Sequence, residues 1–488
     1  MWKPPQRIKY TPLDQPWPSQ EEAEQSRLFQ SFQHGPLHLA QRSWIPAMVP
    51  WRATDEGFVS KNVLDWYRRF AEGQPGAIVI EATGIRDVPS GPLLRIGHDR
   101  YIEGLRKLTQ TVHEASAGQT KVFIQLIDFL SIRRRPEPEK FFQRFLSIDD
   151  ALRERYFEFS KIDHISDADL RNALSELKED ELAQVLDARQ LESLYQGFRE
   201  RVFDPAPHLQ ELPQVLPSLF AEAAERAKAA GFDGIELHYA HAYTMASFLS
   251  ASNVRTDGYG GSRENRVRLP LEVFHAVRNS VGNDYPVGCR FLSEEIITGG
   301  STLEDAQFFA TEFARAGMDF ISLSRGGKFD DAKRPKVGQA AYPYTGQSGY
   351  ECMPSFLSDE QGPFGRNISP TASIRESIRA AGCDTPVVVA GGIHSYRQAE
   401  EILQSDQADI IGIARQAIAD PDWFRKVKSG CGKQVRLCEY SNYCERLDQH
   451  HKEVTCNLWD KEGREEKDVV LSQDGRRRLI APAWKPGN

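Results

Sequence analysis

The stretch GIELHYAHAY, residues 234–243, places three chemically capable side chains directly after an apolar run. His238, His241 and Tyr243 follow residues whose composition is typical of a buried strand. Imidazole N–H groups can stabilise a developing negative charge, and a phenol can deliver a proton. The trio is therefore a candidate catalytic group. The structural alternative is a loop whose polar side chains hydrogen-bond only one another.

Paired histidines also bind metals, so a metal site is a second interpretation of His238 and His241. The carboxylate nearest in sequence is Glu236, which we expect to point away from the two imidazoles. Without a third ligand, the pattern favours hydrogen bonding over metal binding, and we predict no metal.

Eight short apolar runs alternate with segments of helical periodicity along the chain. Runs of this kind indicate parallel strands covered on both faces, and eight strand–helix units predict a (β/α)8 barrel. In such a barrel the reactive residues lie at the C-terminal ends of the strands. The expected strands are 44–49, 77–82, 121–127, 234–238, 286–292, 319–324, 386–392 and 409–414, and the clearest helices are 216–232, 264–282, 301–317 and 369–382.

The 488 residues exceed what a barrel needs. We expect a barrel over 1–430, a helical insertion at 131–205 between strands three and four, and a C-terminal tail over 431–488. Within the insertion, leucines and a valine recur near helical spacing, and Ser166 with Asp169 resembles a helix cap. The insertion is predicted either to form a lid over the pocket or to be a surface addition.

Composition narrows the class of protein. Hydrophobic residues make up 40% and charged residues 27%, which is typical of a globular protein. The net charge of −8 disfavours nucleic acid as the main partner. The sequence shows neither an apolar segment of membrane-spanning length nor a signal peptide, so we expect a cytoplasmic protein without a membrane partner.

Several further positions predict a site for a phosphate-bearing cofactor. Gly391 and Gly392 follow strand seven, and Arg415 follows strand eight, where barrels often bind phosphate. Arg290 within strand five either pairs with Glu236 or Glu81 or faces an anionic part of a cofactor. Gln125 in strand three offers an amide that can contact the edge of a heterocycle.

HYAHAY followed by FLSASNVRTDGYGGSRENRVR resembles the old yellow enzyme family of FMN-dependent ene-reductases. The resemblance extends over about 28–127 and 206–430, with AIVIEATG similar to the second strand and VAGGI and ARQAIADPDW similar to the phosphate end. It implies an FMN-binding barrel that is reduced by NADPH or NADH. It also implies an activated alkene as substrate.

The resemblance implies roles for the trio. His238 and His241 would hydrogen-bond the carbonyl oxygen of the substrate, hydride would come from FMN N5, and Tyr243 would supply the proton. Trp51 and Tyr344 would also contact substrate. The positions implied to bind the cofactor are Met48, Val49, Ala82, Gln125, Arg290, Gly391, Gly392, Ala414 and Arg415.

Two positions depart from the family pattern. Val49 stands where relatives place a Thr or Cys that hydrogen-bonds the flavin, so we expect a more negative reduction potential and slower reduction by nicotinamide. Ala414 replaces a glycine before the phosphate arginine, a small change that an ordinary backbone conformation tolerates.

The tail carries Cys431, Cys438, Cys444 and Cys456. It resembles the iron–sulfur segment of the larger dienoyl-CoA reductase branch, but Ser441 occupies the second ligand position. Serine is a poor ligand for such a cluster. We therefore expect a relic that packs as ordinary tail, with an iron–sulfur cluster and zinc as alternatives.

The main prediction is an FMN- and NAD(P)H-dependent ene-reductase that acts on a small molecule, with a homodimer as the candidate assembly. One alternative is a flavin dehydrogenase or demethylase on the same barrel. The other is a flavin-binding protein with little turnover, which the valine at position 49 and the large insertion favour.

Overall fold

The computed structural model describes residues 16–87, 91–129, 133–196, 202–241, 243–295, 299–325, 337, 340–341, 363–449 and 451–485. Tyr344, predicted at the substrate pocket, lies outside the described residues. The chain forms two compact units. The described part of the smaller unit comprises 133–196, 337 and 340–341, and the larger unit holds the remaining described residues.

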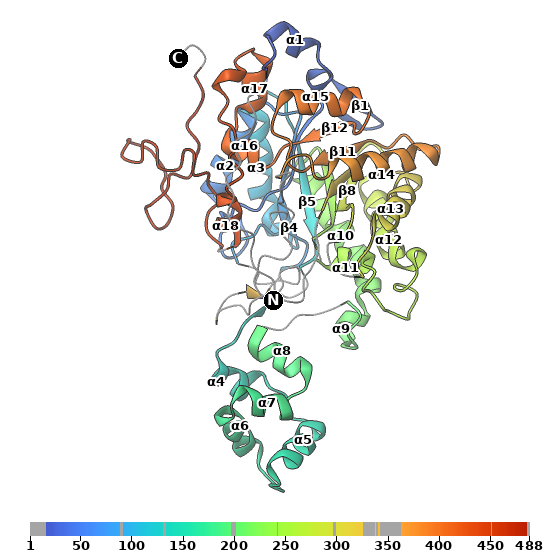
Figure 1. The fold of residues 1–488 in the computed structure, drawn as a ribbon, viewed down its shortest axis with the longest axis vertical. Helices are drawn as coiled ribbons and strands as arrows, with labels where there is room; N and C mark the ends of the chain where they lie inside the picture. Colours follow the sequence, from blue (N-terminus) through green and yellow to red (C-terminus); the bar gives the residue numbers. More distant parts are fainter. Residues whose placement is uncertain are drawn as a thin grey trace. The chain divides into compact units, whose positions relative to one another are not determined.

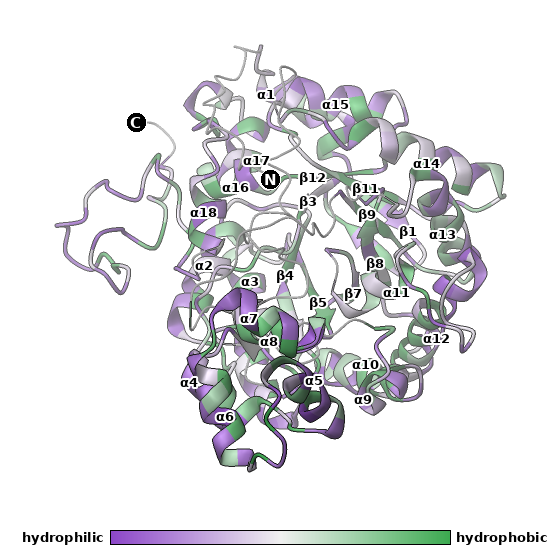
Figure 2. Cartoon of the chain, turned by 60° about the horizontal axis from the view of Figure 1, so that its bottom comes forward, coloured by the Kyte–Doolittle hydropathy of each residue, from purple (hydrophilic) through white to green (hydrophobic). Residues whose placement is uncertain are grey.

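The larger unit contains a closed barrel of eight parallel strands in the order β11-β12-β3-β4-β5-β7-β8-β9 (Figure 1). Figure 2 shows these strands at the centre of the unit with helices around them. The predicted (β/α)8 barrel is thus confirmed. Its strands are β3 (Ser43–Ile45), β4 (Ala77–Gly84), β5 (Lys121–Ile127), β7 (Gly234–Tyr239), β8 (Val287–Leu292), β9 (Ile321–Ser324), β11 (Val387–Ala390) and β12 (Ile410–Gly412).

The first barrel strand is shorter than its apolar run. β3 ends at Ile45 because Pro46 has no N–H to donate to a ladder and Pro50 follows soon after. The outer helices are α2 (Lys61–Ala71), α3 (Ile102–Ala115), α10 (Leu212–Ala229), α12 (Arg263–Val281), α13 (Leu303–Arg315), α14 (Ile368–Ala380), α15 (Tyr396–Gln404), α16 (Arg415–Ala419) and α17 (Trp423–Lys428). The larger unit also contains shorter helices: α1 (Gln20–Gln25), η1 (Arg27–Phe29), η2 (Asp99–Tyr101), α9 (Pro207–Gln210) and α11 (Thr244–Leu249).

Aromatic side chains fill the N-terminal end of the barrel. The Trp44 ring lies 4.9 Å from Phe123 and 5.1 Å from Phe320 between centroids. The hairpin of β1 (Phe32–His34) and β2 (Leu37–Leu39) adds Leu37 and Leu39 to the same core. Because this end is closed by apolar packing, polar chemistry inside the barrel is restricted to the C-terminal end of the strands.

A bulge in β4 decides which of its residues face the barrel interior. The pairing with β5 shifts between Ile80 and Thr83, so one extra residue is inserted. An extra residue exchanges the two faces of a strand. The Glu81 carboxylate accordingly lies toward α2, where the Tyr67 hydroxyl donates to Oε1 at 3.5 Å and accepts the Glu81 N–H at 2.8 Å. Ala82 then takes the interior register in place of the carboxylate.

The smaller unit has its own apolar core. Its elements are β6 (Arg133–Arg134), α4 (Pro138–Lys140), η3 (Phe141–Phe145), α5 (Asp150–Ser160), α6 (Asp167–Glu176), α7 (Glu179–Val185), α8 (Ala188–Gln196) and β10 (Ala340–Ala341). Leu170 and Leu174 are fully inaccessible in that core, and Leu177 packs against it partly buried. Ser166 caps α6 by accepting the Asp169 N–H at 3.1 Å. Strands β6 and β10 pair antiparallel.

The C-terminal segment belongs to the larger unit. It contains η5 (Gly432–Gln434) and α18 (Tyr443–Gln449). The buried Arg52 guanidinium donates to the Val454 and Leu479 carbonyls at 2.8 and 2.7 Å, and the Trp459 indole donates to the Ile418 carbonyl at 2.9 Å. These bonds fix the segment on the barrel.

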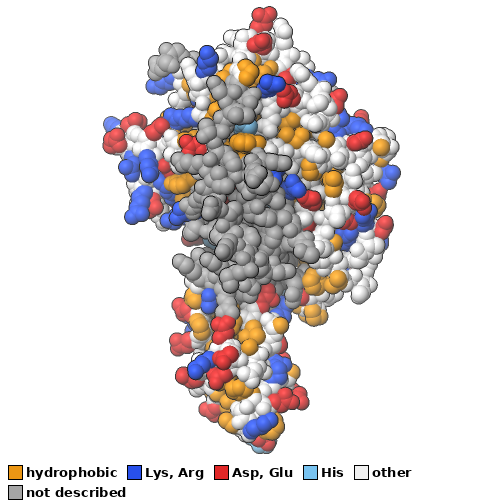
Figure 3. Space-filling view, in the orientation of Figure 1, with side chains coloured by type: hydrophobic (Ala, Val, Ile, Leu, Met, Phe, Trp, Pro, Cys, Tyr) orange, Lys and Arg blue, Asp and Glu red, His pale blue; other side chains and the backbone are white. Residues whose placement is uncertain are grey.

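Figure 3 shows Lys and Arg side chains interspersed with Asp and Glu over the described residues of one face. Within the described ranges, no helix combines the length and apolar character needed to cross a membrane.

Candidate active site

The structure brings the predicted trio together where β7 ends. His238 is the second-last residue of β7, and His241 turns the chain with a φ of 57°. His238 Nε2 lies 3.2 Å from His241 Nδ1, and the ring centroids of His238 and Tyr243 are 5.3 Å apart. Tyr243 immediately precedes α11. A left-handed histidine at a strand end is uncommon and marks a position where the surroundings impose the conformation.

Hydrogen bonds connect the trio with residues of β8 and β9. His241 Nε2 lies 2.8 Å from Ser324 Oγ at the end of β9, and Arg290 Nη2 donates to the same oxygen at 3.5 Å. Ser324 was not among the predicted residues. In the sequence, only its position as the last residue of the expected sixth strand indicates a place in the site.

Both histidines are held neutral. Burial, with the nearby Arg290 charge, lowers the pKa of His238 to about 3. Burial, together with His238 and Arg290, lowers the pKa of His241 well below its usual value. Near neutral pH the pair therefore offers N–H groups without positive charge, which suits an oxygen that gains negative charge during a reaction.

Glu236, the carboxylate nearest to the two histidines in sequence, lies in the barrel interior. Alternate residues of a strand share a face, so Glu236 and His238 both lie on the barrel interior. There Gln125 Nε2 donates to Glu236 Oε1 at 2.6 Å. Burial raises the pKa of Glu236, and the Arg290 charge and the Gln125 hydrogen bond oppose that rise. Among the described residues, no group of three or more His, Cys, Asp or Glu side chains is arranged to hold a metal ion.

Two buried N–H donors of Arg290 make no hydrogen bond with the described part of the chain. Its Nε and Nη1 atoms are inaccessible and lack a hydrogen-bond partner in the described part of the chain. Glu236 supplies an opposing charge nearby, whereas the Glu81 carboxylate contacts the Tyr67 hydroxyl of α2. Since unpaired buried guanidinium groups are costly, this one is suited to an acceptor or anion that enters the barrel.

Five of the predicted cofactor residues line one cavity of about 140 Å³: Arg290, Gly391, Gly392, Ala414 and Arg415. Ser324, Asn367 and Tyr440 line it too. Gly392 has a φ of +69°, and a Cβ there would lie 1.9 Å from the Pro363 carbonyl oxygen, so only glycine fits. The volume is below the roughly 300–1,000 Å³ of a drug-sized ligand site, so it accommodates one end of a flavin nucleotide rather than the whole molecule.

Arg415 is held at this cavity by the C-terminal segment. Its Nη1 donates to Asn442 Oδ1 at 2.7 Å, and its guanidinium lies 4.7 Å from the centre of the Tyr440 ring. Burial lowers its pKa, but Glu445 and the neighbouring tyrosine and cysteines outweigh burial, so the net pKa is raised. Arg415 thus stays charged, as an anion-binding residue must.

The remaining predicted residues lie elsewhere on the same rim. Met48 and Val49 follow β3 and are half-buried, and Ala82 is buried in β4. Trp51 has a φ of 56°, donates from Nε1 to Asp448 Oδ1 at 2.6 Å and stacks on His451. These contacts anchor the Trp51 indole to the C-terminal segment.

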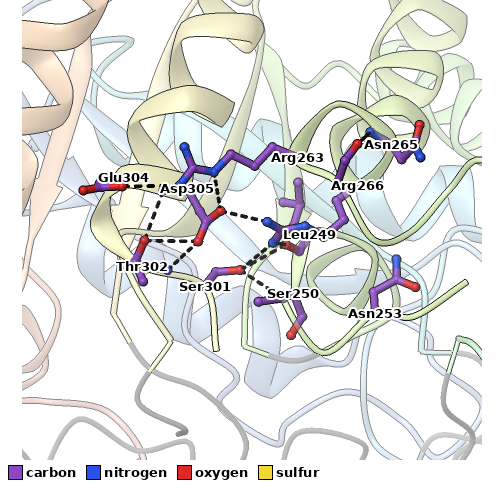
Figure 4. Close-up of polar contacts among 12 residues, drawn as sticks. Leu249, Ser250, Asn253, Arg263, Asn265, Arg266, Ser301, Thr302, Glu304 and Asp305 are labelled. Carbon is purple, nitrogen blue, oxygen red and sulfur yellow. Dashed lines mark hydrogen bonds and ion pairs between the residues drawn. The ribbon is translucent and has the colours of Figure 1, made fainter. Parts of the chain in front are cut away.

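Two arginines of the RTDGYGGSRENR segment join neighbouring helices: Arg266 contacts the end of α11, and Arg263 contacts Glu304 and Asp305 of α13 (Figure 4). Arg266 is buried and donates to the Leu249 carbonyl at 2.7 Å and to Asp305 Oδ1 at 2.7 Å. Asn253 Nδ2 donates to the Phe248 carbonyl at 2.9 Å. The network fixes the C-terminal end of the helix that Tyr243 precedes.

The four tail cysteines are free thiols. Burial raises the pKa of Cys438 and Cys444 and raises that of Cys456 to about 12, so these thiols are held protonated. At the second ligand position, Ser441 Oγ bonds Asn457 Oδ1 at 3.3 Å. A serine hydroxyl at this position is a poor ligand for an iron–sulfur cluster.

Residues 208–434 match the model of the NADH:flavin oxidoreductase / NADH oxidase family. The match covers a little under half of the chain, and over these residues the chain is similar to that family. It is 28% identical to an NADH oxidase of Thermoanaerobacter brockii over 84% of this chain and 52% of that one. It is 29% identical to an NADPH dehydrogenase of Bacillus velezensis over 75% of this chain and 83% of that one.

The old yellow enzyme homologue from Zymomonas mobilis has the same fold, with a TM-score of 0.52 at 21% identity over 82% of this chain and 91% of that one. The chain spans only 52 to 60% of the length of three longer curated relatives.

FMN and a nicotinamide nucleotide, predicted from the resemblance, are the cofactors of this family. The residues present fit FMN. Two guanidinium groups, Arg290 and Arg415, share one cavity with the two glycines after β11, and part of Arg290 is left without a protein partner. Arginine with glycine N–H groups is a phosphate-binding combination, and the unpartnered Arg290 atoms suit an electron-rich ring system.

Proposed function

We propose that this chain is an FMN-dependent oxidoreductase that reduces the C=C bond of an α,β-unsaturated carbonyl compound with electrons from NAD(P)H. The observation that carries the proposal is the neutral His238–His241 pair, hydrogen-bonded at 3.2 Å and packed against the Tyr243 ring. FMN, when bound, supplies the hydride chemistry.

His238 and His241 bind the carbonyl oxygen of the substrate, which takes the place of the hydrogen bond that the two rings make with each other. Hydride addition to the β-carbon of such a compound moves negative charge onto that oxygen. Uncharged imidazole N–H donors in a buried site stabilise the charge more in the transition state than in the ground state. The contacts of His241 with Ser324 and of Ser324 with Arg290 hold the second imidazole in place.

Tyr243 delivers the proton that completes the reduction at the α-carbon. Its ring stands edge-on to both His238 and Phe129, each at 5.3 Å, which fixes the direction of the phenol. A positioned acid of this kind accelerates proton transfer by roughly 10²- to 10⁴-fold. A small-molecule substrate bound at this rim, and a homodimer as the assembly, complete the proposal.

The substrate class is tested by comparing oxidants of the NADPH-reduced protein under anaerobic conditions. 2-Cyclohexen-1-one should reoxidise the flavin, whereas cyclohexene, which lacks the carbonyl oxygen, should not. Equal rates with both compounds would contradict a role for the histidine pair. Reduction of the flavin by a secondary amine, without any response to the ketone, would favour the dehydrogenase alternative.

A further inference from the structure

A segment of the tail, residues 436–442, is fixed directly on the helix that starts with Arg415. Gln416, the second residue of α16, donates from Nε2 to the Arg436 carbonyl at 2.8 Å and accepts the Cys438 N–H at 2.9 Å. Asp420, just after the same helix, accepts the Arg436 N–H at 2.8 Å. Because Gln416 and Asp420 are buried, the position of the segment is tied to the position of α16.

Two side chains of this segment contact the Arg415 guanidinium. Asn442 Oδ1 accepts a hydrogen bond from Nη1 at 2.7 Å, and the Tyr440 ring lies under the guanidinium at 4.7 Å. Tyr440 is itself buried and packs against Phe364 at 5.0 Å. A guanidinium has five N–H donors, so one bond to Asn442 leaves donors for a ligand.

The backbone of the segment is strained at the same two residues. Tyr440 has a φ of 49° and Asn442 a φ of 55°. A left-handed conformation is unfavourable for an L-residue and is least costly for Asn or Asp. Strain of this kind persists where the surrounding contacts impose it, and it concentrates at functional sites. Here the left-handed backbone at both residues brings their side chains into contact with Arg415.

We infer that Tyr440 and Asn442 are positioning residues that hold the Arg415 guanidinium ready for the phosphate of FMN. A free arginine would lose side-chain entropy when it binds the phosphate, and prior ordering removes that cost from binding. The family match ends at residue 434, so both positions lie beyond it. The inference rests on FMN as the cofactor. Contact with Arg415 is then a role of the cysteine-containing tail that needs no metal.

The test compares FMN with riboflavin, which lacks the phosphate, by titrating each into the flavin-free protein and following flavin fluorescence. Asn442→Gly removes the acceptor but tolerates the left-handed backbone, so it isolates the side chain. We expect its FMN affinity to fall about tenfold, as for loss of a charge-assisted hydrogen bond, with riboflavin affinity unchanged. Tyr440→Leu should show the same selective loss, whereas Tyr440→Phe, which keeps the ring, should bind FMN like wild type.

Arg415→Ala provides the reference for loss of the phosphate contact. In the double variant Arg415→Ala, Asn442→Gly, the second change should have no further effect on FMN affinity. Equal weakening of FMN and riboflavin, additive losses in the double variant, or an unchanged FMN affinity in Asn442→Gly would each overturn the inference. Failure of the wild-type protein to bind FMN would instead overturn the cofactor assignment, so the two failures are distinguishable.

Discussion

Tyr243 has a role that separates the two half-reactions of the proposed enzyme. Its phenol is needed only when the alkene is reduced, not when the flavin accepts electrons from NADPH. Tyr243→Phe should therefore lower the rate of ketone-dependent reoxidation by roughly 10²- to 10⁴-fold, with partial rescue by solvent protons. The ring contacts with His238 and Phe129 are retained in phenylalanine, so the fold should be unaffected.

Stopped-flow absorbance under anaerobic conditions measures both half-reactions in one preparation. Bleaching by NADPH should proceed at the wild-type rate in Tyr243→Phe and serves as the internal control. If bleaching and reoxidation slowed by the same factor, the tyrosine would support flavin binding or folding rather than proton transfer.

His238 should make the free energy of unfolding depend on pH. Its pKa is about 3 in the folded chain against 6.5 ordinarily, so between these values the unfolded chain binds a proton that the folded chain does not. The free energy of unfolding should then rise with pH from about 3 to about 6.5, at most by about 1.4 kcal/mol per pH unit, and level off above.

Urea unfolding of wild type and His238→Asn between pH 5 and pH 8 measures this contribution. The variant should show a shallower slope below pH 6.5 and the same slope above. His164→Asn, at a side chain that is 94% exposed, is the matched control and should behave as wild type. Identical slopes in wild type and His238→Asn would show that His238 is not held neutral by the fold.

The sequence predicted those site residues that share one stretch of chain or one motif. His238, His241 and Tyr243 lie within six residues, and the strand end places them on the same rim. Ser324, Asn367, Tyr440 and Asn442 were not predicted, because their roles arise from contacts with residues far away in the chain.

At the scale of elements, α11 and α12 are joined by a buried charge network. Arg266 of α12 bonds the last carbonyl of α11 and Asp305 of α13 (Figure 4). Arg266→Ala should lower the free energy of unfolding by about 3–5 kcal/mol, because it removes one partner of a buried ion pair. Chemical denaturation of the FMN-free protein measures the loss.

Arg268→Ala is the matched control on the same helix. Arg268 is exposed and donates to the Gly258 carbonyl at 2.9 Å, so its loss should cost no more than about 1 kcal/mol. Equal effects of the two substitutions would show that the Arg266 network does not brace α11.

The eight strands were predictable because their apolar runs are long and separated by helical segments. β3 ends early because of Pro46, which lies inside the apolar run 44–49 of the first expected strand. The bulge in β4 was not predictable, because the extra residue is apparent only in the pairing with β5. That bulge is what turns Glu81 away from Arg290.

At the scale of the whole molecule, the insertion forms a compact unit with its own core. Leu174 is fully buried there, and Leu174→Ala should reduce the stability of that unit by about 2–5 kcal/mol. Hydrogen exchange resolved by peptide should show the loss over 150–196 and leave the barrel peptides unchanged. Equal loss of protection in the barrel would show that both units unfold as one. The predicted role of the insertion as a lid stays a prediction.

The visible spectrum of the purified protein, before and after anaerobic addition of NADPH, shows whether this chain binds a flavin that accepts electrons from nicotinamide. We expect a flavin spectrum that bleaches with NADPH and returns when an α,β-unsaturated ketone is added. A protein that shows no flavin spectrum, even after reconstitution with FMN, would contradict the cofactor assignment and the roles given to Arg290 and Arg415.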